Sequence, residues 1–274
     1  MEALRQVEDW PVGLAAVGVT DARATAGRHG EATTVLPWAS VTKVATTLAG
    51  LVAAEEGVLE LDEPAGPPGS TVRHLLAHAS GLPPEGDTPI AQPGARRIYS
   101  NTGFELLAAF VGERAEMPFA DYLRQAVIEP LGLAASLEGS PASGISGTLD
   151  DLLALGRELL APALVAPETL AEATAVAFPG LVGVLPGFGR MDPNDWGLGF
   201  ELRDEKRPHW TGARNSPRTF GHFGQSGSFL WVDPDAGLGC ACLSERDFDD
   251  WAKEAWPQLS DAVLAEVGGT GAAG

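Results

Sequence analysis

The chain has 274 residues, of which 45% are hydrophobic and 20% are charged, so it is long enough to bury a large core. No run of about 18 apolar residues, the length that a membrane-spanning helix needs, occurs in the sequence, and we expect no membrane partner. The formal net charge of −19 also argues against nucleic acid and anionic lipid as partners, because phosphate groups attract basic surfaces.

The first ten residues are polar and of mixed charge, whereas a secretory signal starts with basic residues and continues with an apolar stretch. We therefore expect a cytoplasmic protein. The two cysteines, Cys240 and Cys242, stand two apart on an expected strand, where they point the same way and cannot readily form a disulfide. They form no metal-ligand set, so we interpret them as small buried hydrophobic residues.

Hydrophobic periodicity predicts the elements in chain order. Near the N-terminus we expect a short helix over residues 2–9 and strands over residues 12–19 and 31–36, with a turn-rich stretch between the strands. In the middle of the chain we expect a long helix over residues 40–56 that stops at Gly57, and a short helix capped by Thr71. A Thr102–Glu105 capping box opens the next expected helix, and Thr148 and Asp151 cap a later one. Two further helices are expected after Pro118 and after Pro167. Strands are expected again at 197–202, 219–223, 227–233 and 238–244, followed by a helix over 248–267.

Strands therefore occur at both ends of the chain and helices in the middle. The simplest assembly is an α+β fold in which both termini build one sheet domain, from residues 1–45 and 196–274. Residues 46–195 then form a mostly helical insertion, and we expect the active site at the interface of the two parts.

Ser40 and Lys43 stand three apart at the start of an expected helix, so they share one face, one turn apart. A serine hydroxyl is a poor nucleophile until a neighbour takes its proton, and an amine that is partly neutral can do so. Free N–H groups at a helix start also favour developing negative charge. The pair is a weak signal by itself, since an N-capping serine beside a solvated lysine gives the same pattern.

Tyr99 and Asn101 lie in an expected loop just before a helix. The phenol can accept or relay a proton, and the amide can orient a substrate or a neighbouring side chain. The alternative for Tyr99 is a half-buried anchor. His74 and His78 stand four apart on a helix, a spacing that metals use, but no third ligand is evident, so packing or hydrogen bonding is the better interpretation. The sequence predicts neither a metal nor a cofactor.

Residues 221–227 form a glycine-rich stretch at the end of an expected strand. Glycine allows a backbone to approach a ligand closely, and the N–H of Gln225 is placed to join that of Ser40 as an oxyanion hole. The alternative is a glycine-rich hairpin between two strands. Residues 224–228 do not complete the G-x-S-x-G elbow of α/β-hydrolases.

Several of these motifs together resemble one known family. In order and rough spacing, the chain is similar to the superfamily of serine β-lactamases and penicillin-binding proteins, specifically its class C-like branch of serine hydrolases and esterases. The segments that carry the resemblance are residues 40–43, 74–83, 99–107, 129–133, 221–224 and 230–234.

The resemblance implies an antiparallel sheet flanked by terminal helices, with a mostly helical insertion. It also implies acyl-enzyme chemistry, in which Ser40 attacks a carbonyl while Lys43 and Tyr99 share its proton. Asn101 would orient Lys43 or the substrate, and the N–H groups of Ser40 and Gln225 would hold the oxyanion. Water would then release the acyl group.

The third motif departs from the pattern of β-lactamases and peptidases, which usually have Lys, then Ser or Thr, then Gly. His222, Phe223 and Gly224 stand there instead, so a permanent cation and a hydroxyl for a substrate carboxylate are missing. This favours small neutral esters or amides as substrates, with His222, Gly224 and Gln225 as binding residues. A β-lactamase or D-Ala-type carboxypeptidase or aminopeptidase, an acyltransferase, and a slowly acylated penicillin-sensing module remain alternatives, and the oligomeric state is open.

Overall fold

A six-stranded antiparallel sheet forms the centre of the protein, whose computed structural model describes residues 1–271. Its strands run in the order β2-β1-β11-β10-β9-β8. They are β1 (Ala15–Thr20), β2 (Thr25–Gly30), β8 (Glu201–Leu202), β9 (Phe220–Gly224), β10 (Ser228–Asp233) and β11 (Leu238–Ser244). Both ends of the chain therefore contribute to one sheet, and β1 pairs directly with β11.

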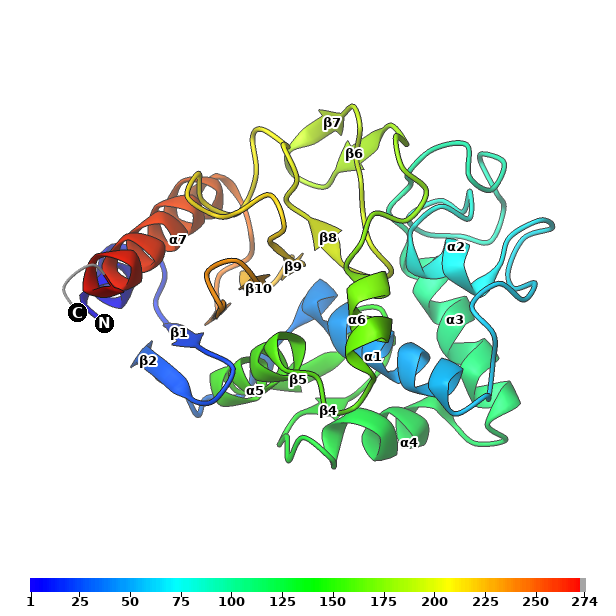
Figure 1. Cartoon of the computed structure of the whole chain (residues 1–274), viewed down its shortest axis with the longest axis horizontal. Coiled ribbons are helices and arrows are strands. Elements are labelled where there is room, and N and C mark those ends of the chain that lie inside the picture. Colours follow the sequence, from blue (N-terminus) through cyan, green and yellow to red (C-terminus); the bar gives the residue numbers. More distant parts are fainter. Residues whose placement is uncertain (272–274) are drawn as a thin grey trace.

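Alternating side chains on the strands enter two separate cores, as expected for a sheet that is covered on both faces. On β10, Phe229 and Trp231 join one core and Leu230 and Val232 join the other. The first core packs under the 3-10 helix η1 (Glu2–Asp9) and the C-terminal helix α7 (Asp250–Gly271), which lie side by side at one end of the molecule (Figure 1). The fold class predicted from the sequence is confirmed.

The second core lies between the sheet and the helical middle of the chain (Figure 1). This part contains η2 (Ala39–Val41), α1 (Thr42–Glu55), α2 (Val72–Leu76), α3 (Asn101–Arg114), α4 (Phe119–Leu123), the π-helical η3 (Arg124–Ile128), α5 (Leu149–Leu160) and α6 (Pro167–Ala173). Twelve of the fourteen residues of α1 are buried, so it is the central helix of this region. No described helix is long and apolar enough to cross a bilayer.

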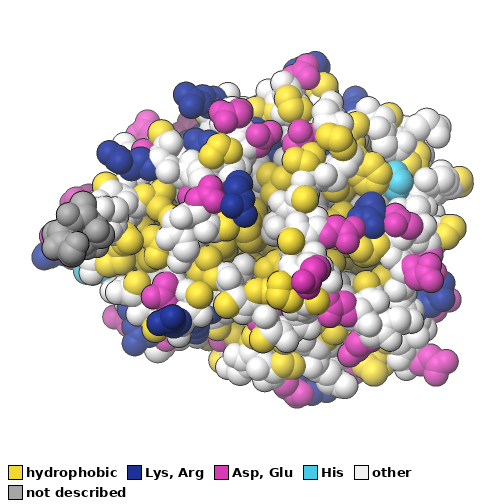
Figure 2. All heavy atoms as spheres, in the orientation of Figure 1, with side chains coloured by type: hydrophobic (Ala, Val, Ile, Leu, Met, Phe, Trp, Pro, Cys, Tyr) yellow, Lys and Arg dark blue, Asp and Glu magenta, His cyan; other side chains and the backbone are white. Residues whose placement is uncertain are grey.

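Shorter strands complete the fold. The strands β3 (Leu36–Pro37), β5 (Ile145–Gly147) and β4 (Ser136–Leu137) form a small sheet, and β6 (Gly183–Leu185) pairs with β7 (Gly189–Met191) in a hairpin. That hairpin lies in a Pro- and Gly-rich stretch for which the sequence predicts mostly loop. Acidic and basic side chains surround a more apolar area on the face of the molecule seen in Figure 2.

Local capping explains where several helices begin. Thr71 accepts the N–H of His74, and Thr148 forms a reciprocal capping box with Asp151, both as predicted. The predicted Thr102–Glu105 box is wrong, because the Ser100 hydroxyl caps α3 two residues earlier by accepting the N–H of Gly103.

The second N-terminal strand is also earlier than predicted, at residues 25–30 instead of 31–36. The carboxylate of Asp21 accepts the N–H groups of Arg23 and Ala24, at 2.6 and 2.8 Å, and closes a tight turn directly after β1. The following residues are therefore already paired with β1. Cys240 and Cys242 are free and buried on β11, in agreement with their interpretation as hydrophobic residues.

Candidate active site

Ser40 lies in the 3-10 turn η2, directly before α1. The predicted helix over 40–56 is thus a short turn followed by an α-helix. Ala39 has a φ of 44°, a left-handed conformation that is uncommon for a residue with a Cβ, and the Trp38 side chain beside it is fully buried. No side chain caps the start of η2 or α1, so the interpretation of Ser40 as an N-cap is wrong.

Lys43 is fully buried, which also excludes a solvated lysine. Its Nζ donates to Asn101 Oδ1 at 2.7 Å and to the carbonyl of Ala142 at 2.9 Å, and it lies 3.4 Å from Ser40 Oγ. Burial lowers the pKa of Lys43 to about 7, against the opposing attraction of the carboxylates of Glu85 and Glu105. A substantial fraction of this amine is therefore neutral near physiological pH.

Tyr99 lies on the other side of the serine. Its hydroxyl donates to Ser40 Oγ at 2.7 Å, and its ring centroid is 4.7 Å from Lys43 Nζ. Burial raises the pKa of Tyr99 above its ordinary value, so the phenol keeps its proton. The ring packs against His78, with centroids 4.6 Å apart, and against Trp196 at 6.0 Å.

Asn101 is the first residue of α3, and both ends of its amide are held. Its Oδ1 accepts from Lys43, and its Nδ2 donates to Glu85 Oε1 at 2.7 Å. The two contacts agree on the orientation of the amide, since a carboxylate only accepts and an ammonium only donates. The Ser100 cap fixes the start of the helix that presents Asn101.

His222 and Phe223 stand on β9, where the third motif was expected. The pKa of His222 is lowered to about 3, chiefly by burial and further by the charge of Lys43, so the ring is neutral at physiological pH. Its Nδ1–H donates to the Phe223 carbonyl at 2.7 Å, and its Nε2 has no hydrogen-bond partner among the described residues. The Phe223 ring is nearly buried against Phe248, at 4.9 Å between centroids.

Gly224 brings β9 directly against the turn that carries Ser40. A Cβ at this position would lie 2.5 Å from the Trp38 carbonyl oxygen and 3.0 Å from the Cβ of Ala39, so only glycine fits. Two serines of the β9–β10 turn hold the same segment: Ser226 Oγ donates to the Pro37 carbonyl and Ser228 Oγ to the Trp38 carbonyl, each at 2.7 Å. These two serines are not recognisable from the sequence, because nothing in the spacing marks them.

A cavity of about 220 Å³ opens beside Ser40. The side chain of Gln225 donates to the Phe248 carbonyl at 3.1 Å, which commits its amide to the protein. Lys43 and Gly224, which the sequence also places at the site, are not among the residues that line it. The residues that line it are Ser40, Tyr99, Asn101, Pro186, Trp196, Glu201, His222, Phe223 and Gln225.

Glu201 is a member of this lining that no sequence motif indicates. It is 1% exposed on β8, next to β9, and it accepts hydrogen bonds from Lys206, from His209 Nε2 at 2.8 Å and from Trp210 Nε1 at 2.9 Å. Burial alone would raise its pKa, but the charges of His209 and Lys206 hold the pKa of Glu201 at about 2. The carboxylate is therefore a fixed negative charge in the wall of the cavity.

His74 and His78 have structural partners. His74 Nδ1 lies 2.9 Å from Thr71 Oγ1, and His78 Nδ1 accepts the N–H of Ser100 at 3.1 Å. Within residues 1–271, no group of three or more His, Cys, Asp or Glu side chains is arranged to hold a metal ion. The prediction that both histidines pack and form hydrogen bonds is confirmed.

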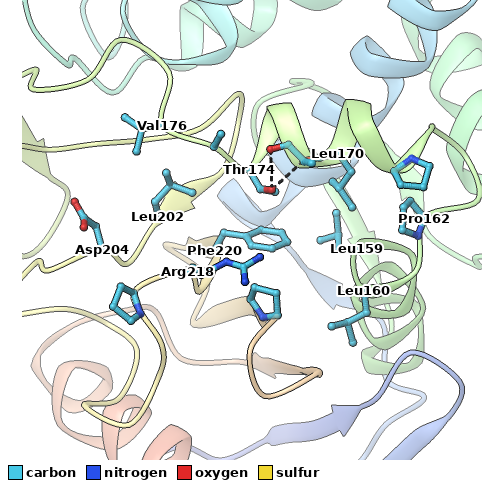
Figure 3. A pocket seen from close by; sticks show the side chains of 15 residues that line it. Leu159, Leu160, Pro162, Leu170, Thr174, Val176, Leu202, Asp204, Arg218 and Phe220 are labelled. Atoms are coloured by element: carbon cyan, nitrogen blue, oxygen red, sulfur yellow. Dashed lines mark hydrogen bonds between the residues drawn. The ribbon is translucent and has the colours of Figure 1, made fainter.

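A second hollow, of about 490 Å³, lies where α5 and α6 meet β8 and β9 (Figure 3). Apolar side chains, mainly leucine and proline, cover most of its wall, and Asp204 and Arg218 are its two charged residues. The hydroxyl of Thr174 bonds back to the Leu170 carbonyl at 2.9 Å, so it is not free to act on a ligand. The hollow shares no residue with the cavity beside Ser40.

The chain is similar to known proteins over most of its length. The family profile described as Beta-lactamase matches residues 7–137 and 134–264. A β-lactamase from Mycobacterium bovis is 53% identical in sequence, with a TM-score of 0.96 that covers 97% of this chain and 99% of that one. EstCE1, described as a hydrolase with promiscuous acyltransferase activity, has the same fold, with a TM-score of 0.80, 18% identity and coverage of 96% and 97%.

A partial match connects the chain to the penicillin-binding proteins. Penicillin-binding protein 4* of Bacillus subtilis is 29% identical over an alignment of 128 residues, with coverage of 35% of this chain and only 28% of that protein's length. The family profile, by contrast, accounts for nearly the whole chain. The protein therefore belongs to the β-lactamase family, within the superfamily of serine β-lactamases and penicillin-binding proteins.

Proposed function

We propose that the protein is a serine hydrolase that cleaves esters or amides through an acyl-serine intermediate. One observation carries the proposal: Ser40 Oγ lies 2.7 Å from the Tyr99 hydroxyl and 3.4 Å from the amine of a fully buried lysine. A nucleophile, a base and a proton donor are then within reach of one atom. Membership of the β-lactamase family supports the same chemistry.

In the first step, the neutral amine of Lys43 takes the Ser40 proton as Oγ attacks the carbonyl carbon. Two N–H groups of the amine are already directed at Asn101 and Ala142, so its lone pair is left for the serine. The same two oxygens then stabilise the ammonium that forms. The raised pKa keeps Tyr99 protonated at neutral pH, so it does not serve as the base and acts instead as a donor to oxygen.

In the second step, the tetrahedral intermediate collapses and the leaving oxygen or nitrogen takes a proton from the Tyr99–Lys43 pair. Backbone N–H groups of Ser40 and Gln225 are the donors that we assign to the oxyanion, since both residues line the same cavity. Water then attacks the acyl group, gives a proton to Lys43, and releases the acid with Ser40 restored. Every proton taken in acylation is thus returned.

The substrate that we propose is uncharged around the bond that is cleaved. His222 is neutral and Phe223 has no hydroxyl, so this side of the cavity offers no cation to a neighbouring carboxylate. Hydrolysis of β-lactams is the second candidate. The 53% identical M. bovis protein, described as a β-lactamase, favours it.

Replacement of the nucleophile tests the reaction. Ser40→Ala is expected to abolish hydrolysis of p-nitrophenyl butyrate, with an unchanged circular dichroism spectrum. The exposed Ser136 on β4 gives a matched control, and Ser136→Ala should keep full activity. A Ser40→Ala variant that is as active as the parent protein would refute the assignment of the nucleophile.

Intact-protein mass spectrometry separates the two candidates. The protein is mixed separately with a fluorophosphonate, an activated short-chain ester and a penicillin. A fluorophosphonate adduct on Ser40, with rapid ester turnover and no penicillin adduct, supports the esterase. A lasting penicilloyl adduct, or rapid loss of penicillin, supports the second candidate instead.

A further inference from the structure

A larger chamber adjoins the catalytic cavity. It has a volume of about 720 Å³, in the range of ligand sites, and it shares Tyr99 and Pro186 with the cavity beside Ser40. Its wall comes from two segments, residues 84–99 and 182–190, which a bridge between Arg97 and Gly183 joins. A ligand that reacts at Ser40 can therefore extend past Tyr99 into this chamber.

The chamber has an apolar wall that remains in contact with water. Ile90 is 55% exposed and Val184 is 59% exposed, and both line it together with Pro84, Ile98 and Val182. Single exposed hydrophobic side chains are common on proteins. Here they surround one concave site, so an apolar chain of a ligand would cover them together and gain from the area removed from water.

The charged side chains that line the chamber are all arginines. In a chain with 37 acidic and 18 basic residues, the lining contains Arg96, Arg97 and Arg190 and no carboxylate. The guanidinium of Arg97 is buried and is used by the protein, since it donates to the carbonyls of Ala77, Ala177, Phe178 and Asn194. It supports the floor of the chamber and is not available to a ligand.

The other two arginines are available. Arg96 is exposed and has no hydrogen bond or ion pair with any residue that the structure describes. Arg190 is 71% exposed at its side chain and pairs with Asp192 at 3.2 Å, a surface contact that is weak and screened by salt. Two guanidinium groups without a buried partner thus stand at an apolar chamber in a protein that is otherwise strongly acidic.

We propose that this chamber binds the far part of the substrate, an apolar chain that ends in a carboxylate, with Arg96 and Arg190 as the partners of the carboxylate. The inference rests on the proposed function, because it defines which substrates reach Ser40. This proposal agrees with a substrate that is uncharged around the scissile bond, because the carboxylate of the substrate is bound beyond Tyr99. Arginine suits this role because its planar fork matches the two oxygens of a carboxylate.

Binding tests the chamber independently of catalysis. Octanoate and octanamide have the same apolar chain and differ in charge, and their affinities are measured by calorimetry at low and high salt. We expect octanoate to bind at least about fivefold more tightly at low salt, and the preference to shrink as salt screens the guanidinium groups. Equal affinities for the two ligands at low salt would overturn the proposal.

Substitution of the arginines locates the site. Arg96→Gln and Arg190→Gln are each expected to reduce the ratio of octanoate to octanamide affinity by about threefold, and the double variant to abolish the preference. Arg218→Gln is the matched control, since Arg218 also stands beside an apolar hollow (Figure 3), which shares no lining residue with the chamber. If Arg218→Gln removes the preference, or the double variant retains it, the proposal is wrong.

A kinetic experiment connects the chamber to Ser40. The kcat/KM of the mono-p-nitrophenyl ester of octanedioic acid is compared with that of p-nitrophenyl octanoate. The Arg96→Gln and Arg190→Gln double variant should lower the ratio of the two values about tenfold, chiefly through KM. An unchanged ratio counts against the inference. If instead Ser40→Ala leaves the hydrolysis rates of both esters unchanged, the proposed reaction is wrong. The binding experiment then still tests the chamber by itself.

Discussion

At the scale of single residues, Lys43 combines a buried amine with three polar neighbours. Burial keeps part of the amine neutral, and the contacts to Asn101 Oδ1 and the Ala142 carbonyl stabilise it once it takes a proton. A solvent-exposed lysine would be almost fully charged at neutral pH. The same environment therefore makes Lys43 a usable base and holds it in position beside Ser40.

The first prediction concerns the pH dependence of this base. Only the neutral amine accepts a proton, so kcat/KM for p-nitrophenyl butyrate should rise with pH through about 7 and then level off. Lys43→Met should lower kcat/KM by about 10²-fold or more and remove the rise. The partly exposed Lys253, on α7, provides the control, and Lys253→Met should retain the profile of the parent. A flat profile between pH 5.5 and 8.5 in the parent protein would exclude Lys43 as the base.

The second prediction separates Tyr99 from Lys43. The raised pKa of Tyr99 makes it a proton donor, so Tyr99→Phe should affect poor leaving groups more than good ones. We expect a loss of about 10²-fold for ethyl butyrate and a much smaller loss for p-nitrophenyl butyrate, whose leaving group departs without a proton. Tyr122 is the only other tyrosine, and its hydroxyl donates to Glu56, so Tyr122→Phe is the control. Equal losses for both esters would contradict the donor role.

At the scale of elements, the β9–β10 turn holds the segment that presents Ser40. Ser226 and Ser228 bind two successive carbonyls of that segment, and Gly224 packs against it without a side chain. These three residues thus hold the backbone around Ala39 in its left-handed conformation, from the side of β9 and β10. Strain of this kind persists only where the surroundings fix it.

The third prediction tests this support. Gly224→Ala places a methyl group against the Trp38 carbonyl, so β9 and η2 must separate. We expect a loss of stability of about 1–3 kcal/mol and a loss of activity of more than about tenfold. Gly268→Ala, in α7, meets no atom within 4 Å and should leave both unchanged. Thermal unfolding and p-nitrophenyl butyrate kinetics are the measurements, and a fully active Gly224→Ala protein would show that the contact does not position Ser40.

Helix starts show what local sequence can and cannot predict. The Thr148–Asp151 box is a local signal and was predictable, because both members lie within one turn of the helix. The start of α3 was misassigned, since Ser100 and Thr102 are equally suitable caps and the choice depends on tertiary packing. The 3-10 turn before α1 depends on contacts with Gly224, almost two hundred residues away, and no periodicity reveals it.

At the scale of the whole molecule, the strand patterns at both ends of the chain were sufficient to predict one shared sheet. Helical spacing predicts that Ser40 and Lys43 meet, and the family resemblance implies that Tyr99 and Asn101 join them. The structure brings all four within hydrogen-bonding distance of one another or of a shared neighbour. The carbonyl of Ala142 could not be predicted, because any residue offers a carbonyl. The position of Glu201 in the site could not be predicted either, because a single glutamate on a short strand belongs to no recognisable motif.

The fourth prediction concerns stability and pH. Burial lowers the pKa of His78 well below its ordinary value and that of His222 to about 3, so the unfolded chain binds more protons below about pH 6.5. The free energy of unfolding should therefore fall as pH falls from 6.5 toward 3, and these groups add no slope above that range. Urea unfolding at pH 4, 5, 6 and 7 measures it. His222→Gln should reduce the change of the free energy of unfolding with pH, whereas His29→Gln, at the surface, should not. A parent protein that is equally stable at pH 4 and pH 7 would contradict the prediction.

The buried guanidinium of Arg97 anchors the segment that carries the β6–β7 hairpin, and this matters for redesign of the protein. It ties the backbone beside Tyr99 to the carbonyl of residue 77, after α2, and to the carbonyls of residues 177, 178 and 194. The last three flank the segment that carries the β6–β7 hairpin. Between these residues Leu185 and Met191 are buried in the core, whereas Val184 and Arg190 are exposed and can change without disturbing it. Exchange of these two exposed residues is therefore a route to new substrate ranges that leaves the reacting groups in place.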